Sequence, residues 1–549
     1  MLKHVKKKIV PTSLSTALIL SSLVALQKEP AKKETKRPKN DETNVIMLIM
    51  DGSSDNVSTI ARWYKGEPLA LDSILTGASR TYSAESAITD SAPAATALAT
   101  GYKSNSGYVG VLPSTITTPG VEQKEEDAFK PVANVLEGAK RVGKATGIVS
   151  TSEIQHATPA GFTAHVVSRG NYDDIAEQQV YQDMDVVLGG GLASLQEKRK
   201  DGENLISVIE NNGYDFVQTR EQLFKSNTNK IWGSFAPSAL AYDMDRTVTK
   251  PEEPTLAEMT EKAIDTLNKD KDGFFLMVEG SKIDWAAHAN DPIGMITDFL
   301  AFDAAVAEAL EFAKKDGNTL VIAVTDHGNS GITLGNANTT NGYDKMPVSA
   351  YIEPLKGAKM TVEGALSQLK EDKSNLEEVA ALYGLTDLTE QEREVLGKSE
   401  NLSATLAQLL STRANLGYTT GGHTGDDVFL YAYGPNKPTG LVENTDLANI
   451  MARTMDFDLD DLTNTLYTEA QTALTNKGFA VTIDKSNSNN PVLVATKDNV
   501  TYKLAENKNT IVKEFKNSPK LNKVITVSGV TAYNDTNFYI SQQALDVME

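Results

Sequence analysis

Acidic side chains, histidines and a threonine follow several apolar stretches of this sequence, at positions where they could form a metal centre. Asp51 follows the apolar run 45–50, and Glu279 follows the run 274–278. The chain has no cysteine, so any metal must be held by histidine, aspartate or glutamate. The residues at such positions are Asp51, His156, Thr158, Glu279, Asp326 and His327.

Histidine is scarce, and its placement strengthens this interpretation. The chain has six histidines, and we single out His288, His327 and His423, which lie beside another potential ligand or a glycine-rich loop. One partly buried histidine is more often held by structural hydrogen bonds, but three in such settings favour a metal site. Asp284 and His288 have the i, i+4 spacing that lets two helical side chains reach one ion, and Glu279 precedes them.

A serine near the start of a small-residue helix could meet a phosphate group. The segment 89–101 reads TDSAPAATALATG, and Ser91 would lie where helix N–H groups and the helix dipole favour an anion. Taken alone, the segment is better explained by Asp90 or Ser91 acting as the helix cap. The spacing therefore leaves a phosphate site and a simple cap both open.

Strands must alternate with helices to bring these residues together. Continuous apolar runs at 45–50, 146–149, 273–278, 320–324 and 428–433 are typical of strands covered on both faces, and helical patterns lie between them. This alternation predicts an α/β fold. Open α/β sheets bind ligands at the carboxyl ends of their strands, where the polar residues lie.

Two further segments differ from the alternating pattern. Residues 361–416 are rich in Leu, Ala, Glu and Lys at helical spacing, which predicts a helical insertion. Residues 478–549 contain short Val, Ile, Thr and Tyr runs, such as 492–496 and 524–527, which predict a small β-rich C-terminal module. One alternative is that the chain is a surface-binding protein that acts through this module.

The charge distribution argues against nucleic acid as a partner. The net charge is −20, but residues 1–40 are basic, so the remainder carries about −28. Such a body repels phosphate backbones at long range. The content of 40% hydrophobic and 23% charged residues is ordinary for a globular protein.

The N-terminus predicts export. Four lysines at positions 3–8 precede the apolar stretch 9–26, which is typical of a signal peptide, and an uncleaved membrane anchor is the alternative. The lysine-rich stretch after it, up to residue 43, is a predicted linker. We therefore expect a periplasmic, cell-surface or extracellular protein, with a membrane or cell-surface tether if the segment is retained.

Together these segments resemble the alkaline phosphatase family from about residue 44 to 435, in the family's motif order. The resemblance implies a large mixed, mostly parallel central sheet with helices on both faces, within a catalytic domain at 44–477. It also implies hydrolysis of small phosphate monoesters. The matching segments are Asp51, Asp90-Ser91-Ala92, His156-Ala157-Thr158, Ser168-Arg169, Glu279 with Asp284 and His288, Thr325-Asp326-His327, and Gly422-His423-Thr424-Gly425.

The resemblance also implies roles for these residues. Ser91 matches the family's nucleophile, which forms a phosphoserine, and Arg169 matches its phosphate clamp. Two zinc ions and one magnesium ion are the implied cofactors. The implied ligands are Asp284, His288 and His423 for one zinc, Asp51, Asp326 and His327 for the other, and Asp51, Thr158 and Glu279 for magnesium.

Two positions depart from the best-known family pattern. His156 stands where some members have an aspartate near magnesium, and Trp285 stands where they have a lysine near phosphate; both are expected to line the substrate site. Other members share this His and Trp combination, and the change weakens the assignment of the third metal. A phosphodiesterase, sulfatase or phosphonate hydrolase on the same scaffold is the nearest alternative, and a homodimer is a family expectation.

Overall fold

The computed structural model of the chain describes residues 43–196 and 199–548. The predicted export segment at 1–26, and the linker up to residue 42, lie outside these ranges. Among the residues described, no helix is both long and apolar enough to cross a lipid bilayer.

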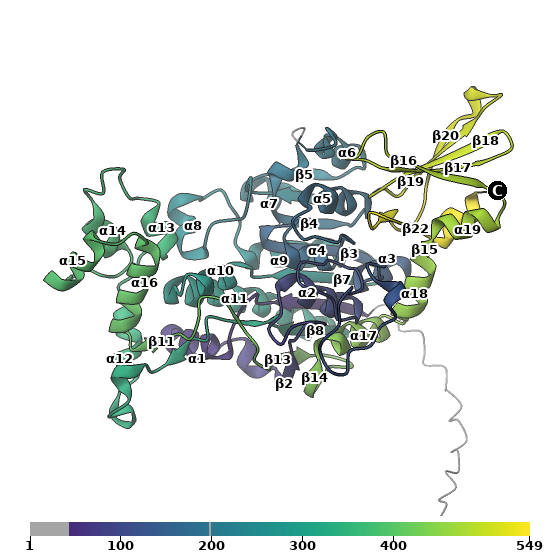
Figure 1. Cartoon of the computed structure of the whole chain (residues 1–549). Helices are drawn as coiled ribbons and strands as arrows, with labels where there is room; N and C mark the ends of the chain where they lie inside the picture. Colours follow the sequence, from purple (N-terminus) through teal and green to yellow (C-terminus); the bar gives the residue numbers. More distant parts are fainter. Residues whose placement is uncertain (1–42, 197–198, 549) are drawn as a thin grey trace, which may run out of the picture. The chain divides into compact units, whose positions relative to one another are not determined.

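A ten-stranded sheet forms the centre of the fold (Figure 1), in the order β14-β2-β13-β8-β1-β7-β3-β4-β6-β5. β13 is antiparallel to both of its neighbours, and the other pairs are parallel. The predicted α/β fold with a mixed, mostly parallel sheet is therefore confirmed. The strands are β1 Asn44–Ile49, β2 Leu75–Arg80, β3 Ala145–Glu153, β4 Val186–Gly190, β5 Asp215–Val217, β6 Ile231–Ser234, β7 Phe274–Glu279, β8 Thr319–Val324, β13 Val428–Tyr433 and β14 Gly440–Glu443.

Both faces of this sheet are buried, which explains the unbroken apolar strands. In β1, Ile46 and Leu48 pack into one hydrophobic cluster, whereas Val45 and Met47 pack into another. Successive strand residues point to opposite faces, so a strand with apolar residues at every position needs cover on both sides.

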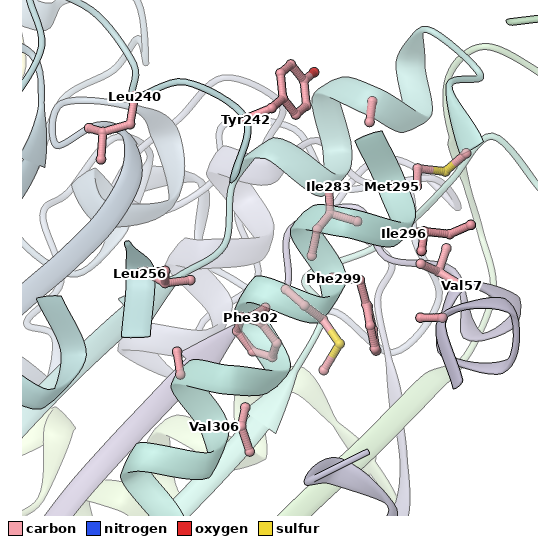
Figure 2. Packing of buried hydrophobic residues seen from close by; sticks show 14 of the residues in the cluster. Val57, Leu240, Tyr242, Leu256, Ile283, Met295, Ile296, Phe299, Phe302 and Val306 are labelled. Carbon is pink, nitrogen blue, oxygen red and sulfur yellow. The ribbon is translucent and has the colours of Figure 1, made fainter. Parts of the chain in front are cut away.

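Long helices provide that cover. Figure 2 shows Phe299, Phe302 and Val306, from one face of α11, packed in the first cluster near Ile283 of α10. The principal helices are α1 Asp55–Lys65, α2 Ser91–Thr100, α3 Val135–Arg141, α4 Ala157–Gly161, α5 Tyr172–Tyr181, α6 Leu205–Asn211, α7 Arg220–Lys225, α8 Asp243–Thr249, α9 Leu256–Leu267, α10 Lys282–His288, α11 Pro292–Asp316, α17 Asn444–Thr454 and α18 Leu459–Leu466.

The segment 361–416 is largely helical and belongs to the first cluster, to which Ala365, Leu396 and Leu410 contribute. A bidentate ion pair between Arg413 and Glu392 joins two of its helices. These helices are α13 Val362–Leu366, α14 Leu376–Leu382, α15 Glu390–Gly397 and α16 Leu402–Arg413.

The C-terminal residues form a separate antiparallel meander, drawn in yellow in Figure 1. Tyr502, Leu504 and Ile511 lie in its own hydrophobic cluster. The β-rich C-terminal part predicted from the sequence is confirmed. Its strands are β16 Ala480–Asp484, β17 Val492–Lys497, β18 Val500–Ala505, β19 Thr510–Phe515 and β20 Lys523–Thr526.

Candidate metal centre and nucleophile

The three central strands bring distant acidic residues to one edge of the sheet. β1 lies between β7 and β8 and is parallel to both. Asp51 follows β1, Glu279 is the last residue of β7, and Asp326 follows β8. All three side chains are buried, with at most 2% of each residue exposed, so their charges need compensation.

Asp284, His288 and His423 form the first ligand group, whose ligand atoms lie within 4.8 Å of one another. His288 Nε2 lies 3.5 Å from Asp284 Oδ2, and His423 Nε2 lies 3.7 Å from Asp284 Oδ1. The two Nε2 atoms are only 3.2 Å apart. A cation among these atoms would satisfy both imidazole lone pairs and the carboxylate.

Asp51, Asp326 and His327 form the second ligand group, which meets the same distance limit and is fully buried. His327 Nε2 lies 3.6 Å from Asp51 Oδ1 and 3.3 Å from Asp326 Oδ2. The Ser91 hydroxyl oxygen lies 3.0 Å from the same nitrogen. The serine oxygen therefore lies directly beside this group.

Asp51, His156 and Glu279 form the third ligand group. Thr158, which the sequence places here, has a buried hydroxyl without a hydrogen-bond partner among the described residues. The other buried atoms of this region in the same condition are both Asp51 carboxylate oxygens, His156 Nδ1, Glu279 Oε1 and Asp326 Oδ2. Such a concentration of unpaired acceptors fits a set of bound cations.

Main-chain carbonyl groups orient the histidine rings of the first two groups. The Nδ1 atom of each ring contacts a carbonyl oxygen, so Nδ1 carries the proton and the lone pair of Nε2 is left for a cation. The contacts are His288 Nδ1 with Gly421 O at 2.9 Å, His423 Nδ1 with Thr89 O at 2.8 Å, and His327 Nδ1 with Gly328 O at 3.2 Å.

Burial and like charges disfavour ionised carboxylates at this centre. Burial, followed by the charges of Asp326, Asp284 and Glu279, raises the pKa of Asp51 well above its usual value. Burial also raises the pKa of Glu279 to about 7. Burial lowers the pKa of His327 to about 3, so its imidazole is neutral at neutral pH. Neutral imidazoles and carboxylates that lack a counter-charge are suited to divalent cations.

Gly52 and Asn329 hold Asp284 in position. Gly52 has φ +67°, and a Cβ atom there would lie 2.3 Å from Asp284 Oδ1. Only glycine allows this close approach of the chain to a ligand. Asn329 Nδ2 donates to Asp284 Oδ1 at 2.7 Å, a contact that the sequence did not reveal because the two residues are 45 positions apart.

The helix α2 presents Ser91 to the centre. Asp90 caps α2 by accepting a hydrogen bond from Ala92 N at 3.3 Å. Ser91 is the first residue of the helix, and its hydroxyl contacts His327. The cap hypothesis therefore holds for Asp90, and the Ser91 oxygen remains available for chemistry.

Arg169 lies between Asp90 and His156 beside the centre. Arg169 Nη1 donates to Asp90 Oδ1 at 2.5 Å, and Nη2 contacts His156 Nε2 at 3.1 Å. About 29% of the Arg169 side chain is exposed, so a ligand can reach it. The sequence identified Asp90 only as a cap, whereas the structure also shows it orienting Arg169.

Trp285 stands against His156, with ring centroids 5.8 Å apart in an edge-on arrangement. Behind it lies Lys282, which the sequence did not single out. Lys282 Nζ is 4.3 Å from the Trp285 ring and 4.2 Å from the Tyr242 ring. Its side chain is only 3% exposed, so this cation supports Trp285 from the protein interior.

The remaining described histidine has a structural role. His165 is buried, with Nδ1 2.8 Å from Gly110 O and Nε2 3.1 Å from Glu137 Oε1. Tyr467 also contacts Nε2, at 2.6 Å. His165 is therefore held by hydrogen bonds away from the ligand groups, as expected of an isolated buried histidine.

Comparison with known proteins finds one matching family model and several similar proteins. The family model described as "Alkaline phosphatase" matches residues 42–457. "Alkaline phosphatase 3" of Bacillus subtilis is 36% identical over 486 residues, which cover 83% of this chain and 99% of that protein. "Repressible alkaline phosphatase" of Saccharomyces cerevisiae is 31% identical, with coverage of 84% and 89%.

Solved structures are similar as well. The alkaline phosphatase of Thermus thermophilus superposes with a TM-score of 0.66 at 28% identity, covering 75% of this chain and 91% of that one. A histidine-to-glutamate mutant of the alkaline phosphatase from TAB5, described with Mg bound in a site named M3, gives a TM-score of 0.55 at 27% identity. It covers 76% of this chain and 99% of that one.

Proposed function

The chain belongs to the alkaline phosphatase family and hydrolyses phosphate monoesters with the help of metal ions, and we propose that Ser91 is its nucleophile. The observation that carries this proposal is the 3.0 Å contact between Ser91 Oγ and His327 Nε2, within a ligand group. Ser91 attacks phosphorus, the alcohol departs, and water then hydrolyses the phosphoserine to release inorganic phosphate.

We propose that the first and second ligand groups hold zinc and that the third holds magnesium with Thr158. Imidazole and carboxylate ligands suit zinc, whereas oxygen ligands suit magnesium. Bound cations would supply the positive charge that lowers the pKa of the Ser91 hydroxyl and stabilises the departing oxygen. His156 adds a nitrogen to the third group, and the similarity to the TAB5 mutant structure described with Mg bound supports magnesium as an ion of such a site.

Arg169 would bind the phosphoryl group through its guanidinium. A planar guanidinium can donate to two nonbridging oxygens at once, and Asp90 and His156 fix its plane before substrate arrives. Trp285 would form an uncharged wall of the same site. Preorganised donors of this kind favour the charge that develops in the transition state.

The test is Ser91→Ala measured with p-nitrophenyl phosphate and with its bis ester. We expect wild-type protein to prefer the monoester and to form labelled phosphoserine, and Ser91→Ala to lose the label and most turnover while retaining metal. Ser411→Ala, a buried serine that contacts Tyr418, is the matched control and should label normally. A labelled Ser91→Ala protein would refute this nucleophile.

We further propose that residues 1–26 direct export and that residues 44–477 form the catalytic domain, with an insertion at 361–416. The module at 478–549 would be dispensable for turnover, because the ligand groups lie outside it. Fractionation of cells that express the whole chain tests export. Recovery of the activity in the cytoplasm alone would count against it.

A further inference from the structure

A turn at the edge of the C-terminal meander exposes two apolar side chains. The turn, residues 516–522, joins β19 to the edge strand β20. Leu521 is 61% exposed, and Val524 is 64% exposed. Among the residues that the structure describes, only Val248 and Tyr343 are large apolar side chains with a higher exposed fraction. Leu521 and Val524 thus form an apolar tip that a partner can cover.

Hydrogen bonds hold the backbone of this turn in one arrangement. Leu521 N donates to Ser518 O at 2.9 Å, and Asn522 N donates to Pro519 O at 3.1 Å. Asn522 Oδ1 also accepts from Phe515 N at 2.9 Å, which ties the end of the turn to β19. A partner that covers the tip therefore does not have to order the chain first, which keeps the entropy cost of binding low.

Four lysines lie beside the apolar tip without an acidic partner among the described residues. Lys513 and Lys523 are directly opposite each other on β19 and β20, where two like charges repel. The nearby carboxylate of Glu514 lies 2.9 Å from Lys503 and is neutralised by it. We call the four residues the lysine cluster: Lys513, Lys516, Lys520 and Lys523. The cluster carries positive charge that an anionic partner would neutralise.

The acidic body of the protein does not cancel this charge. The module contacts the body through Lys508, whose Nζ lies 3.3 Å from Glu177 and 2.9 Å from Glu203. Lys516 is eight residues further along, roughly 26 Å away at about 3.3 Å per extended residue. Charges are screened over about 8 Å at physiological ionic strength, so those carboxylates have little effect at the cluster. The β17–β18 turn adds only residues 497 and 498, a lysine and an aspartate whose charges offset each other.

A lipid surface explains both the apolar tip and the lysines. Lysines on an edge strand discourage pairing between sheets, but exposed Leu521 and Val524 would favour such association. A nucleic acid or another polyanion would use the lysines and leave the apolar side chains in water. At an anionic bilayer, apolar side chains enter the headgroup boundary while lysines lie near the lipid phosphates.

We propose that residues 513–524 bind the surface of an anionic lipid bilayer. Leu521 and Val524 enter the headgroup region, and the lysine cluster lies against the lipid phosphates. This contact is separate from any anchoring by residues 9–26. It goes beyond the proposed catalytic function, because it holds the protein at a membrane surface without taking part in turnover.

Co-sedimentation with lipid vesicles tests this proposal. The chain used begins at residue 41, because residues 41–549 form one compact unit and the apolar stretch 9–26 is then absent. We expect binding to phosphatidylcholine vesicles that contain about 30% phosphatidylglycerol, and much weaker binding to phosphatidylcholine alone. Lys520→Ala with Lys523→Ala should weaken binding by about 25-fold, and Leu521→Ser by about 10-fold. Salt at about 0.5 M should weaken binding of the wild-type protein.

Lys437→Ala with Val248→Ser is the matched control, because both side chains are exposed and lie outside the module and the catalytic residues. It should bind vesicles as the wild-type protein does, and every variant should still hydrolyse p-nitrophenyl phosphate. Equal binding to both kinds of vesicle, or an equal loss in the control, would overturn the proposal. Tighter binding to duplex DNA than to vesicles, with Leu521→Ser unaffected, would identify a polyanion as the partner and would also overturn it.

Discussion

Replacing Asp51 by asparagine should have opposite effects on stability with and without metal ions. Asp51 belongs to both the second and the third ligand groups, and it is fully buried. In metal-loaded protein, Asp51→Asn removes a ligand from two sites. If each site binds about 100-fold more weakly, each loses about 2.7 kcal/mol of stabilisation.

In chelated protein the same change removes a repulsive charge. The carboxylates of these groups lie within 4.8 Å of their neighbours. Two charges at that distance repel by about 3.5 kcal/mol at an effective dielectric constant of about 20. Protonation relieves part of this repulsion, so we expect Asp51→Asn to stabilise the chelated protein by about 2–3 kcal/mol.

Thermal unfolding followed by circular dichroism, with saturating zinc and magnesium or with EDTA, measures both effects. An unfolding entropy of about 2.1 cal/mol/K per residue, over roughly 500 residues, converts 1 kcal/mol into about 1 °C. Asp51→Asn should therefore lower the midpoint by about 5 °C with metal and raise it by about 2–3 °C with EDTA.

Asp291→Asn is the matched control, since Asp291 is equally buried but accepts hydrogen bonds from Tyr383 Oη at 2.7 Å and Val362 N at 3.0 Å. It should destabilise the protein by about 1–3 kcal/mol in both conditions. If Asp51→Asn lowers the midpoint equally with and without EDTA, the carboxylates are not arranged for cations and the reasoning fails.

Three further changes test the surroundings of the centre. Arg169→Lys should raise the inhibition constant for inorganic phosphate and lower kcat/KM, each by about 10- to 100-fold, because an ammonium group cannot donate two hydrogen bonds in the plane that Asp90 sets for the guanidinium. An unchanged inhibition constant would show that Arg169 does not bind the phosphoryl group. Lys282→Met should weaken phosphate inhibition about 3-fold and also lower the melting temperature, because it removes the ring contacts and the cation that faces Glu363 at 4.0 Å and the buried Asp298; an unaltered inhibition constant would contradict this. Hydrogen bonds from Arg413 lower the pKa of Glu392 to about 2 from 4.5, so the stabilisation that ionised Glu392 gives the folded protein is complete above about pH 4.5 and is lost as the pH falls towards 2. Glu392→Gln should therefore lower the melting temperature at pH 7 but not at pH 2. An equal loss at both pH values would refute the assignment.

The sequence predicted those parts of the molecule that depend on local pattern. The unbroken apolar run of β1 required cover on two faces, and the structure provides it. The i, i+4 spacing of Asp284 and His288 places both on α10, as a helix requires. Asp51 and Asp326 were identified because each ends an apolar strand.

The supporting contacts were not predictable in this way. Asn329 donates to Asp284, 45 positions earlier in the chain. Lys282 packs against Trp285 and also against Tyr242, which directly precedes α8. Nothing in the local pattern distinguishes Asn329 from other loop asparagines. The orientation of Arg169 by Asp90, 79 positions away, likewise depends on the folded chain.

The carbonyl contacts of the three ligand histidines have a consequence for divergence within the family. Every residue type supplies the same carbonyl oxygen, so positions 89 and 421 can change side chains and still orient the imidazoles, provided that the backbone path persists. Position 328 is different, because a Cβ atom on Gly328 would lie 2.4 Å from Thr424 Oγ1. Sequence change in these loops is therefore limited by the path of the backbone more than by which side chains the loops carry. Insertions or deletions in these loops should be far more damaging than substitutions.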